Sequence, residues 1–397
     1  MSTLQVSRTV EIPDQLRIGR YRKAPELGPR MLFFSGGTAL NGLSKALKNY
    51  THNSTHLVTP FDSGGSSAEL RNAFGMPSIG DLRSRLIALA DETVLGHPEV
   101  YQLFNYRFPK HKSEKQLRQR LNKMVEGKSG LVVGISNPMR RLICNHLGYF
   151  QKAMPNSFDL RGASIGNLIL AGGYLNNHRH LDPIIFLFSK LVNVLGTVRS
   201  VVTDDLHLGA DLADGSRVIG QHRLTGKEMS PLTSPVKRLF LSQHLDRYTP
   251  ANCLLKGKNR KLIESADLIC YPHGSFYSSM LVNLLPKGVG RTIAGRSCPK
   301  VYIPNQGKDP EQIGMNHELM ITTLLSQLRV DAGANCATRR LLNFIMIDSK
   351  RGRGFSPAAL KQAGDLGIQI IDTPLISKRS APYYDDELLV SALLSLT

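Results

Sequence analysis

The sequence predicts an α/β protein with a Rossmann-like, doubly wound and mainly parallel sheet, to which a small antiparallel hairpin is added. Three observations predict this fold. Short apolar runs recur along the chain, several of them run into glycine-rich turns, and segments with helical spacing of apolar residues separate them. Strands that are almost continuously apolar and separated by helices are typical of a parallel sheet covered on both faces.

The first two predicted βα units lie near the N-terminus. A strand over 31–34 runs into the turn Ser-Gly-Gly-Thr at 35–38, and leucines at helical spacing follow between 40 and 47. A second strand over 57–59 leads to the stretch Asp-Ser-Gly-Gly-Ser-Ser at 62–67. Because both glycine-rich turns follow strands, we expect them at the carboxyl edge of one sheet, where α/β proteins bind ligands.

The rest of the sheet is predicted from later apolar runs, at 130–135, 267–271, 300–303, 344–347 and 368–371. The stretch 206–222 differs, because its residues alternate around Asp214-Gly215, a dipeptide that favours a hairpin turn. We therefore expect a small antiparallel addition there.

Length and composition bound the domain organisation. With 397 residues and 41% apolar composition, the chain is long enough for a sizeable core. We predict an N-terminal extension over 1–30, to which we assign no role, and one α/β domain over 31–397. That domain carries a basic helical insertion around 100–160 and the hairpin around 200–225.

The formal charge of +19 favours encounter with anionic ligands or surfaces without saying which. The densest basic block lies at 107–128, and we interpret it as a solvated helix and loop. Nucleic-acid binding is the alternative that we disfavour, because the aromatic residues of this block gather at one end and do not alternate with the charges.

Cysteine usage points to a reducing compartment. The five cysteines are scattered and lack the close spacing of zinc sites or redox motifs, so we interpret them as reduced thiols. The sequence shows neither a signal peptide nor a run of about 20 apolar residues. We therefore expect a cytoplasmic protein without a membrane segment.

The turn at 35–38 predicts a phosphate contact, because free backbone N–H groups and the helix dipole favour anions where a helix begins. The turn is not a dinucleotide fingerprint, because the G-x-G-x-x-G spacing is absent, and it is not a Walker loop, because Leu43 follows Gly42. The alternative is that its glycines only permit a tight turn. A G-x-S-x-G nucleophile motif is absent from the strand ends, which weighs against serine hydrolysis.

Polar residues beside these turns have two interpretations each. Asp62 lies where a nucleotide-binding fold places a carboxylate against a ribose or a cation, or it is a turn residue. Asp81 either caps the helix that opens at Gly80 or is a second ligand of a divalent cation. Ser164 precedes an apolar helix and either caps it or contacts the ligand. His273 follows a buried strand, where a further phosphate or sugar contact is expected.

In order along the chain, these motifs resemble the CofD and YvcK superfamily. They read FSGGTALN at 34–41, DSGGSSAELR at 62–71, GDLR at 80–83, SIGN at 164–167, ADLI at 266–269 and HGSFYSS at 273–279. The motif YDD at 384–386 is similar to the start of the family's last helix, and the resemblance covers roughly residue 32 to the C-terminus. Within the superfamily, the chain is most similar to the CofD-like subgroup found with ATP-grasp partners in the GAK system.

The resemblance implies a Rossmann-like fold that binds a nucleoside diphosphate conjugate or a nucleotide sugar. CofD transfers a phospholactyl-type group from a guanosine diphosphate conjugate to an acceptor with magnesium, whereas YvcK proteins bind UDP-sugars and regulate carbon metabolism and cell-wall synthesis. The chain departs from the family's paired aspartates, because Ser63 follows Asp62. This departure removes one cation ligand that the resemblance implies, and Asp81 is the residue that would compensate for it.

Two functions therefore stay open, a CofD-type phosphotransferase and a YvcK-like regulator that binds a UDP-sugar without catalysis. The resemblance further implies an ATP-grasp partner protein, and we expect a homodimer. Asp62 is the candidate catalytic residue, and Asp62 with Asp81 would hold Mg²⁺. The expected ligand contacts are Gly36, Gly37, Thr38, Ser63, Gly64, Gly65, Ser66, Ser67, Arg71, Gly80, Arg83, Ser164, Gly166, Asn167, His273, Gly274 and Ser275.

Overall fold

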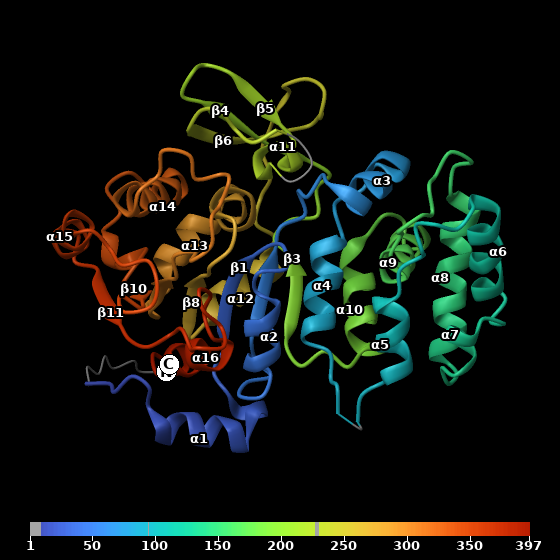
Figure 1. Cartoon of the computed structure of the whole chain (residues 1–397), viewed down its shortest axis with the longest axis horizontal. Coiled ribbons are helices and arrows are strands. Elements are labelled where there is room, and N and C mark those ends of the chain that lie inside the picture. Colours follow the sequence, from blue (N-terminus) through green and yellow to red (C-terminus); the bar gives the residue numbers. More distant parts are fainter. Residues whose placement is uncertain (1–8, 94, 227–229) are drawn as a thin grey trace.

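The computed structural model describes residues 9–93, 95–226 and 230–397. Its centre is a seven-stranded sheet with the strand order β11-β10-β9-β8-β1-β2-β3, and all recorded strand pairs in it are parallel (Figure 1). The strands are β1 (Met31–Ser35), β2 (Thr55–Val58), β3 (Thr197–Ser200), β8 (Leu268–Tyr271), β9 (Lys300–Tyr302), β10 (Phe344–Ile347) and β11 (Gln369–Asp372). The chain leaves β1 toward β2 on one side and later returns to β8 on the other, so a topological switch point lies at β1.

Alternate residues of β1 point to opposite faces, as a doubly wound sheet requires. Leu32 and Phe34 pack in one apolar cluster with helices α12 (Gly257–Ser265), α13 (Val289–Gly295), α14 (His317–Ala332) and α15 (Pro357–Asp365). Met31 and Phe33 pack in another with α1 (Gln15–Lys23), α2 (Asn41–Leu47) and α16 (Asp386–Leu394). The Rossmann-like, doubly wound α/β prediction is confirmed.

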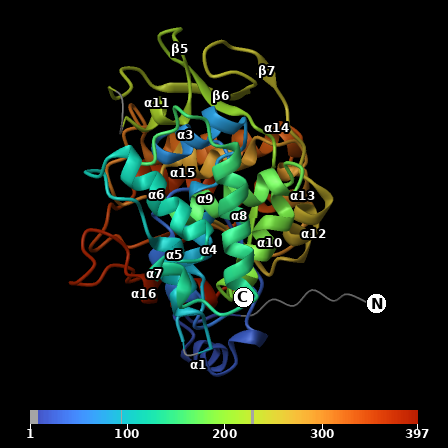
Figure 2. The same cartoon turned by 90° about the vertical axis from the view of Figure 1, so that its right-hand side faces the viewer.

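A large helical unit lies between β2 and β3, and its helices face the viewer in Figure 2. Its apolar cluster includes Val58 of β2 and Val198 of β3, so the unit is anchored on the edge of the sheet. The helices are α3 (Gly65–Phe74), α4 (Gly80–Ala88), α5 (Pro98–Asn105), α6 (Glu114–Val125), α7 (Gly130–Val133), α8 (Met139–Ala153), α9 (Ile165–Asn176) and α10 (Leu181–Leu191).

The strand predicted at 130–135 is wrong. The structure forms α7 there, and Val132 and Ile135, three residues apart, are buried in the helical unit. A short apolar run does not distinguish a strand from a buried helical turn, and here the surrounding helices decide. The parallel strand β3 (Thr197–Ser200) has only two buried residues and no apolar run, and the sequence did not predict it as a strand of the main sheet.

The predicted hairpin is present as β4 (His207–Leu212) and β5 (Arg217–Ile219), and it belongs to a larger antiparallel sheet with the strand order β5-β4-β6-β7. The added strands are β6 (Val236–Ser242) and β7 (Pro250–Ala251). The short helix α11 (Gln221–Thr225) follows β5 and lies between this sheet and the main sheet (Figure 1).

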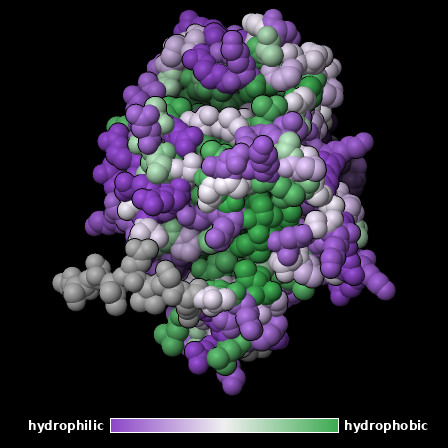
Figure 3. All heavy atoms as spheres, turned by 90° about the vertical axis from the view of Figure 1, so that its left-hand side faces the viewer, coloured by the Kyte–Doolittle hydropathy of each residue, from purple (hydrophilic) through white to green (hydrophobic). Residues whose placement is uncertain are grey.

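The N-terminal segment packs on the C-terminal helix, because Arg17 donates to the backbone oxygen of Ser395 and the N–H of Asp14 donates to its hydroxyl. One-turn elements complete the chain, at Pro25–Leu27, Phe276–Met280, Leu281–Leu284 and Thr338–Arg340. On the β11 side, the surface carries an apolar strip between hydrophilic areas (Figure 3). Within the described residues, no helix combines the length and apolarity that a membrane crossing requires.

Candidate functional site

A cavity of about 650 Å³ opens at the carboxyl edge of the main sheet. Its walls come from the segments after β1, β2 and β8, from the helical unit and from α11. This volume lies within the range of small-molecule sites, and the position beside the switch point at β1 is where open α/β sheets bind ligands.

Gly36 and Gly37 in the segment after β1 have different structural roles. Gly36 is buried, and a Cβ atom added there would lie 2.4 Å from Cγ2 of Thr59, so this glycine allows close packing. Gly37 has φ +62°, and its N–H donates to Oδ2 of Asp81 at 2.7 Å. This amide already has a carboxylate acceptor. The amide of the neighbouring residue Thr38 is therefore the better candidate for a contact with a ligand.

Helix α2 begins at Asn41, so the helical segment predicted between 40 and 47 is confirmed, and a short loop separates it from the glycines. Thr38 is exposed and lines the cavity. Within the described residues, no acceptor is recorded for its N–H. This N–H is free to face an anion.

The segment after β2 presents a helix N-terminus to the cavity. Asp62 accepts a 3.2 Å hydrogen bond from the N–H of Gly64, and Gly65, with φ +48°, begins α3. The N–H groups of Gly65 and Ser66 have no recorded acceptor among the described residues, and both residues line the cavity. Unsatisfied N–H groups at the first turn of a helix form an anion site together with the helix dipole.

Asp81 is not the cap of α4. Ile79 occupies the cap position, and the Asp81 carboxylate instead accepts the Gly37 N–H. Asp62 and Asp81 line the same cavity, and Gly80, the first residue of α4, lies close to the Asp62 turn, since a Cβ atom there would be 3.8 Å from Oδ2 of Asp62. Within the described residues, no group of three or more His, Cys, Asp or Glu side chains is arranged to hold a metal ion.

Ser164 and Asn167 join the helical unit to the glycine-rich turn. The Ser164 hydroxyl accepts a 3.4 Å hydrogen bond from the N–H of Asn167. Ser164 therefore caps α9, which was one of the two interpretations of this residue. The Asn167 amide nitrogen then donates to the Ser66 hydroxyl at 3.4 Å. Gly166 is a packing position, because a Cβ atom there would lie 2.7 Å from the backbone oxygen of Phe104.

Arg71 does not line the cavity. Its buried guanidinium donates to the backbone oxygen of Asp62 at 3.1 Å, to Asp205 at 2.8 Å and to the backbone oxygen of Leu206 at 2.7 Å. With these donors bound to the protein, Arg71 connects the glycine-rich turn to the segment before β4. A ligand contact by Arg71 stays a prediction, and its observed role is to hold the turn.

His222 is a cavity residue that the sequence analysis missed. It comes from α11, and its Nδ1 lies 2.8 Å from the hydroxyl of Ser63. Gly220, with φ +111°, leaves room for the imidazole, because a Cβ atom there would lie 2.7 Å from its Cε1. The only local sequence feature that could have indicated it is Gly-Gln-His at 220–222, directly after a hairpin strand. Such a tripeptide is too common to indicate a site.

The segment after β8 offers fewer donors than expected. The N–H of Phe276 donates to Asp309 at 2.8 Å, and the N–H groups of Tyr277 and Ser278 donate to Glu311 at 3.0 and 2.8 Å. These carboxylates occupy the amides that a phosphate would otherwise meet. Glu311 is 1% exposed, and burial together with the charge of Asp309 raises its pKa to about 7.

Nε2 of His273 donates to the backbone oxygen of Ala39 at 3.2 Å, and burial lowers the pKa of His273 to about 4. The imidazole is thus neutral near pH 7 and adds no positive charge for a phosphate. Gly274, with φ +134°, turns the chain so that Ser275 reaches the cavity.

Most of the predicted residues meet in this cavity, although their roles in binding stay predictions. Those that line it are Gly37, Thr38, Asp62, Gly64, Gly65, Ser66, Ser67, Gly80, Asp81, Arg83, Ser164, Asn167 and Ser275. Gly36, Ser63, Arg71, Gly166, His273 and Gly274 are not among its lining residues and instead pack against or hold those that are. The remaining wall comes from the helical unit and α11.

The fold and this cavity define a Rossmann-like α/β protein with glycine-rich turns at the carboxyl edge of its sheet. A family model described as 2-phospho-L-lactate transferase CofD matches residues 31–366, so the chain belongs to the CofD family.

Relatives agree with this assignment. The gluconeogenesis factor of Bacillus subtilis is 30% identical over 282 residues, which cover 71% of this chain and 69% of that protein. A putative gluconeogenesis factor of Nostoc is 28% identical over 326 residues, which cover 81% of this chain but only 56% of that protein. A crystal structure of a UPF0052 family member from Bacillus halodurans superposes with a TM-score of 0.64 at 24% identity, covering 92% of this chain and 99% of that one, and shows the same fold.

Proposed function

We propose that the cavity binds a nucleoside diphosphate conjugate and that the protein transfers a phospho-organic-acid group from it to an acceptor. One observation carries this proposal: Thr38, Gly65 and Ser66 come from two separate turns and line one cavity, and no acceptor is recorded for their N–H groups among the described residues. Amides that belong to neighbouring strand ends suit a diphosphate better than a single phosphate, because each turn can hold one phosphate group.

In the proposed reaction, the acceptor hydroxyl oxygen forms a new bond to phosphorus, and the bond from phosphorus to the nucleoside monophosphate breaks. Asp62 is the cavity carboxylate to which we assign the hydroxyl proton. The backbone amides stabilise the charge on the phosphate oxygens. Such transfer rests on positioning and electrostatics and needs no covalent intermediate on the protein.

Magnesium fits this cavity in one way. The ion commonly binds through one or two carboxylates together with phosphates of the ligand, and Asp62 and Asp81 are two carboxylates on the cavity wall. Mg²⁺ bound there would neutralise negative charge on the diphosphate. Asp81 would have to share its carboxylate between the ion and the Gly37 N–H.

A second candidate is a regulator that binds a nucleotide sugar without transfer. The observation that favours it is that relatives matched over most of this chain are named gluconeogenesis factors. In this case the same amides hold the diphosphate, and ligand binding shifts a conformational equilibrium instead of leading to a reaction.

Thermal unfolding with GDP, UDP and UDP-glucose, each with and without Mg²⁺, tests the ligand class. A ligand at 100 times its Kd adds about 2.7 kcal/mol of stability, which is readily measured. Guanosine and uridine serve as controls without phosphate. Stabilisation by the diphosphates and by UDP-glucose, but not by these nucleosides, supports the proposal. The absence of any shift with all three nucleotides contradicts it.

Phosphorus NMR then separates transfer from regulation. The purified protein is incubated with a guanosine diphosphate conjugate of lactate, whose outer phosphate carries the lactyl group, and a hydroxyl acceptor of the deazaflavin class. Release of GMP that requires both the acceptor and Asp62 supports transfer. An intact conjugate that nevertheless stabilises the protein supports the regulator.

The five cysteines are free thiols in the structure, in keeping with a reducing environment. We therefore place the proposed activity in the cytoplasm.

A further inference from the structure

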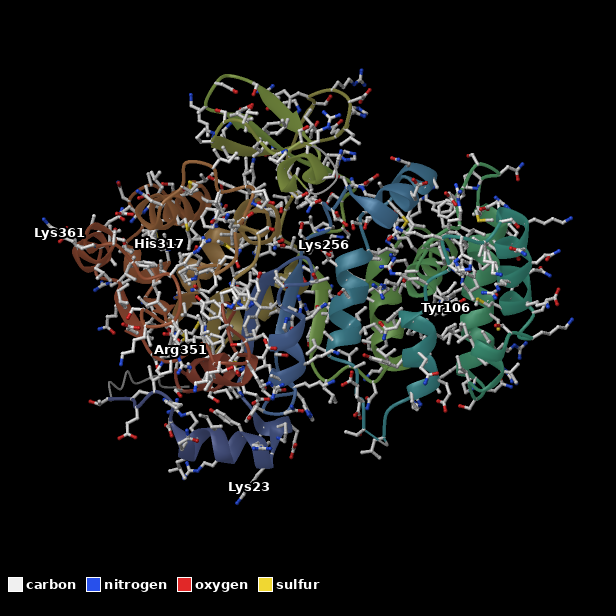
Figure 4. All side chains as sticks on the ribbon, viewed as in Figure 1. Lys23, Tyr106, Lys256, His317, Arg351 and Lys361 are labelled. Atoms are coloured by element: carbon white, nitrogen blue, oxygen red, sulfur yellow. The ribbon has the colours of Figure 1, made fainter. Side chains whose placement is uncertain are left out.

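The helical unit contributes a basic wall to the cavity, opposite in composition to the glycine-rich turns. Arg83 comes from α4, and Arg107 and Lys110 come from the segment between α5 and α6. The last two open the basic block that the sequence analysis interpreted as solvated surface. Figure 4 places their neighbour Tyr106 on the helical unit.

Backbone pairing fixes Arg107 beside the cavity. The N–H of Phe108 donates to the oxygen of Ala163 at 2.9 Å, and the N–H of Gly162 donates back to Phe108 at 3.0 Å. Arg107 itself donates through Nη1 to the oxygen of Gly162 at 3.2 Å. Among the described residues, no hydrogen-bond partner is recorded for the other guanidinium nitrogens of Arg107.

Lys110 lies over Gly162 in the same pairing. A Cβ atom added at Gly162 would be 3.3 Å from Cε of Lys110, so the glycine makes room for the lysine side chain. Gly162 has φ +73°, a conformation that also favours glycine.

Arg83 belongs to the same wall and comes from α4. Its Nη1 donates to the oxygen of Phe104 at 3.3 Å, and its stem packs at Gly166, where an added Cβ atom would lie 2.8 Å from Cδ of Arg83. Its buried Nε has no hydrogen-bond partner among the described residues. Burial and the nearby charge of Arg107 lower the pKa of Arg83 to about 10.

Most cations of this wall form no direct ion pair within the described part of the chain, although the nearby charge of Asp81 raises the pKa of Arg83 against the larger effect of burial. No ion pair joins Arg83, Arg107 or Lys110 to a carboxylate there, whereas Arg161, also on the wall, is paired to Asp159 at 2.8 Å. The positive charges of Arg83, Arg107 and Lys110 on this cavity wall repel one another. An anion placed between them relieves the repulsion.

We infer that Arg83, Arg107 and Lys110 form a second anion subsite, which binds a phosphate or carboxylate group beyond the diphosphate held by the glycine-rich turns. This inference rests on the proposed function in assigning the diphosphate to those turns. The molecule or molecules that bind in the cavity then carry two separate anionic groups. The outer group belongs either to the far end of the nucleotide conjugate or to a separate acidic second substrate.

The test uses the double variant Arg107→Met with Lys110→Met, because both side chains are exposed and their loss leaves the core intact. Lys115→Met is the matched control, since Lys115 is an exposed cation of the same basic block that does not line the cavity. Inorganic phosphate is titrated by calorimetry at constant ionic strength, because salt alone screens surface charges.

We expect phosphate to bind the wild type and the control equally. The double variant, which loses two charge-assisted contacts, should bind it at least about tenfold more weakly. Equal phosphate affinity in all three proteins, or none in the wild type, overturns the inference. The affinities for UDP and GDP test the proposed function separately from the subsite. If the wild type binds phosphate but neither UDP nor GDP, the proposed function is contradicted and the subsite is not.

UDP-glucuronate and UDP-glucose identify the source of the outer anion. If it belongs to the conjugate, UDP-glucuronate binds the wild type more tightly than UDP-glucose does, and the double variant abolishes the difference. If it belongs to a second substrate, phosphate binds in the presence of saturating UDP and the two sugars bind alike. Both outcomes support the subsite.

Discussion

The backbone N–H of Gly37 donates a 2.7 Å hydrogen bond to Oδ2 of Asp81, which joins the turn after β1 to the first turn of α4. The bond gives Asp81 a structural role beside any role in cation binding. Substitutions at this position can separate the two roles, because an amide keeps an acceptor oxygen and loses the charge.

Asp81→Ala removes the acceptor, and we expect a loss of about 1–3 kcal/mol in unfolding free energy, since Gly37 then lacks its partner. Asp81→Asn should recover much of this stability while removing any additional stabilisation by Mg²⁺ in the presence of nucleotide. Chemical denaturation with and without the ion measures both quantities. If Asp81→Asn keeps the full magnesium response, Asp81 does not bind the ion.

Gly36→Ala tests the close approach between the turn and β2. The added methyl would lie 2.4 Å from Cγ2 of Thr59, so we expect a destabilisation of about 1–3 kcal/mol. Thr59→Ser removes Cγ2 and keeps the hydroxyl that accepts the Phe61 N–H. The double variant should therefore be more stable than the two single effects predict by addition, and strict additivity in a denaturation cycle would show that the clash is relieved elsewhere.

Glu311 predicts a pH dependence of stability. Its folded-state pKa is raised to about 7 from 4.5, so between these pH values the folded protein keeps a proton that the unfolded chain has lost. Unfolding free energy therefore falls as pH rises through this window. Glu311→Gln is neutral at every pH and should remove this part of the fall. Denaturation at pH 5, 6, 7 and 8 measures the difference, and parallel curves for both proteins would contradict the raised pKa.

The Ser63–His222 contact links the glycine-rich turn to the antiparallel sheet. Ser63 is buried, and its hydroxyl lies 2.8 Å from Nδ1 of His222. Ser63→Ala, His222→Ala and the double variant form a cycle in which we expect a coupling of about 1 kcal/mol. A coupling near zero would mean that α11 is held by its other contacts alone.

Much of the main sheet could be predicted because its strands are buried on both faces. Runs such as 268–271 and 344–347 are apolar throughout, and a parallel sheet covered by helices is the arrangement that buries them. The same reasoning failed at 130–135, where α7 buries a similar run between helices. Local composition is the same in both cases, and the environment differs.

The candidate site was predicted in part for a related reason. Glycine-rich turns after strands necessarily meet at one sheet edge, so Thr38 and Gly65 were expected to lie near each other, and both line the cavity. His222 and Arg107 reach the same cavity from the antiparallel sheet and the helical unit. Nothing in their local sequence indicates this, because insertions pack according to surfaces built from distant residues.

The sequence by itself determined the α/β class, the order of the main βα units and the two turns whose amides would hold phosphates. Each of these follows from apolar periodicity and from the conformations that glycine permits, which are local properties of the chain. The tertiary structure alone decided which amides remain free. The Gly37 N–H donates to Asp81, whereas no acceptor among the described residues is recorded for the N–H groups of Gly65 and Ser66. Hydrogen bonds between distant segments are fixed only when the elements pack.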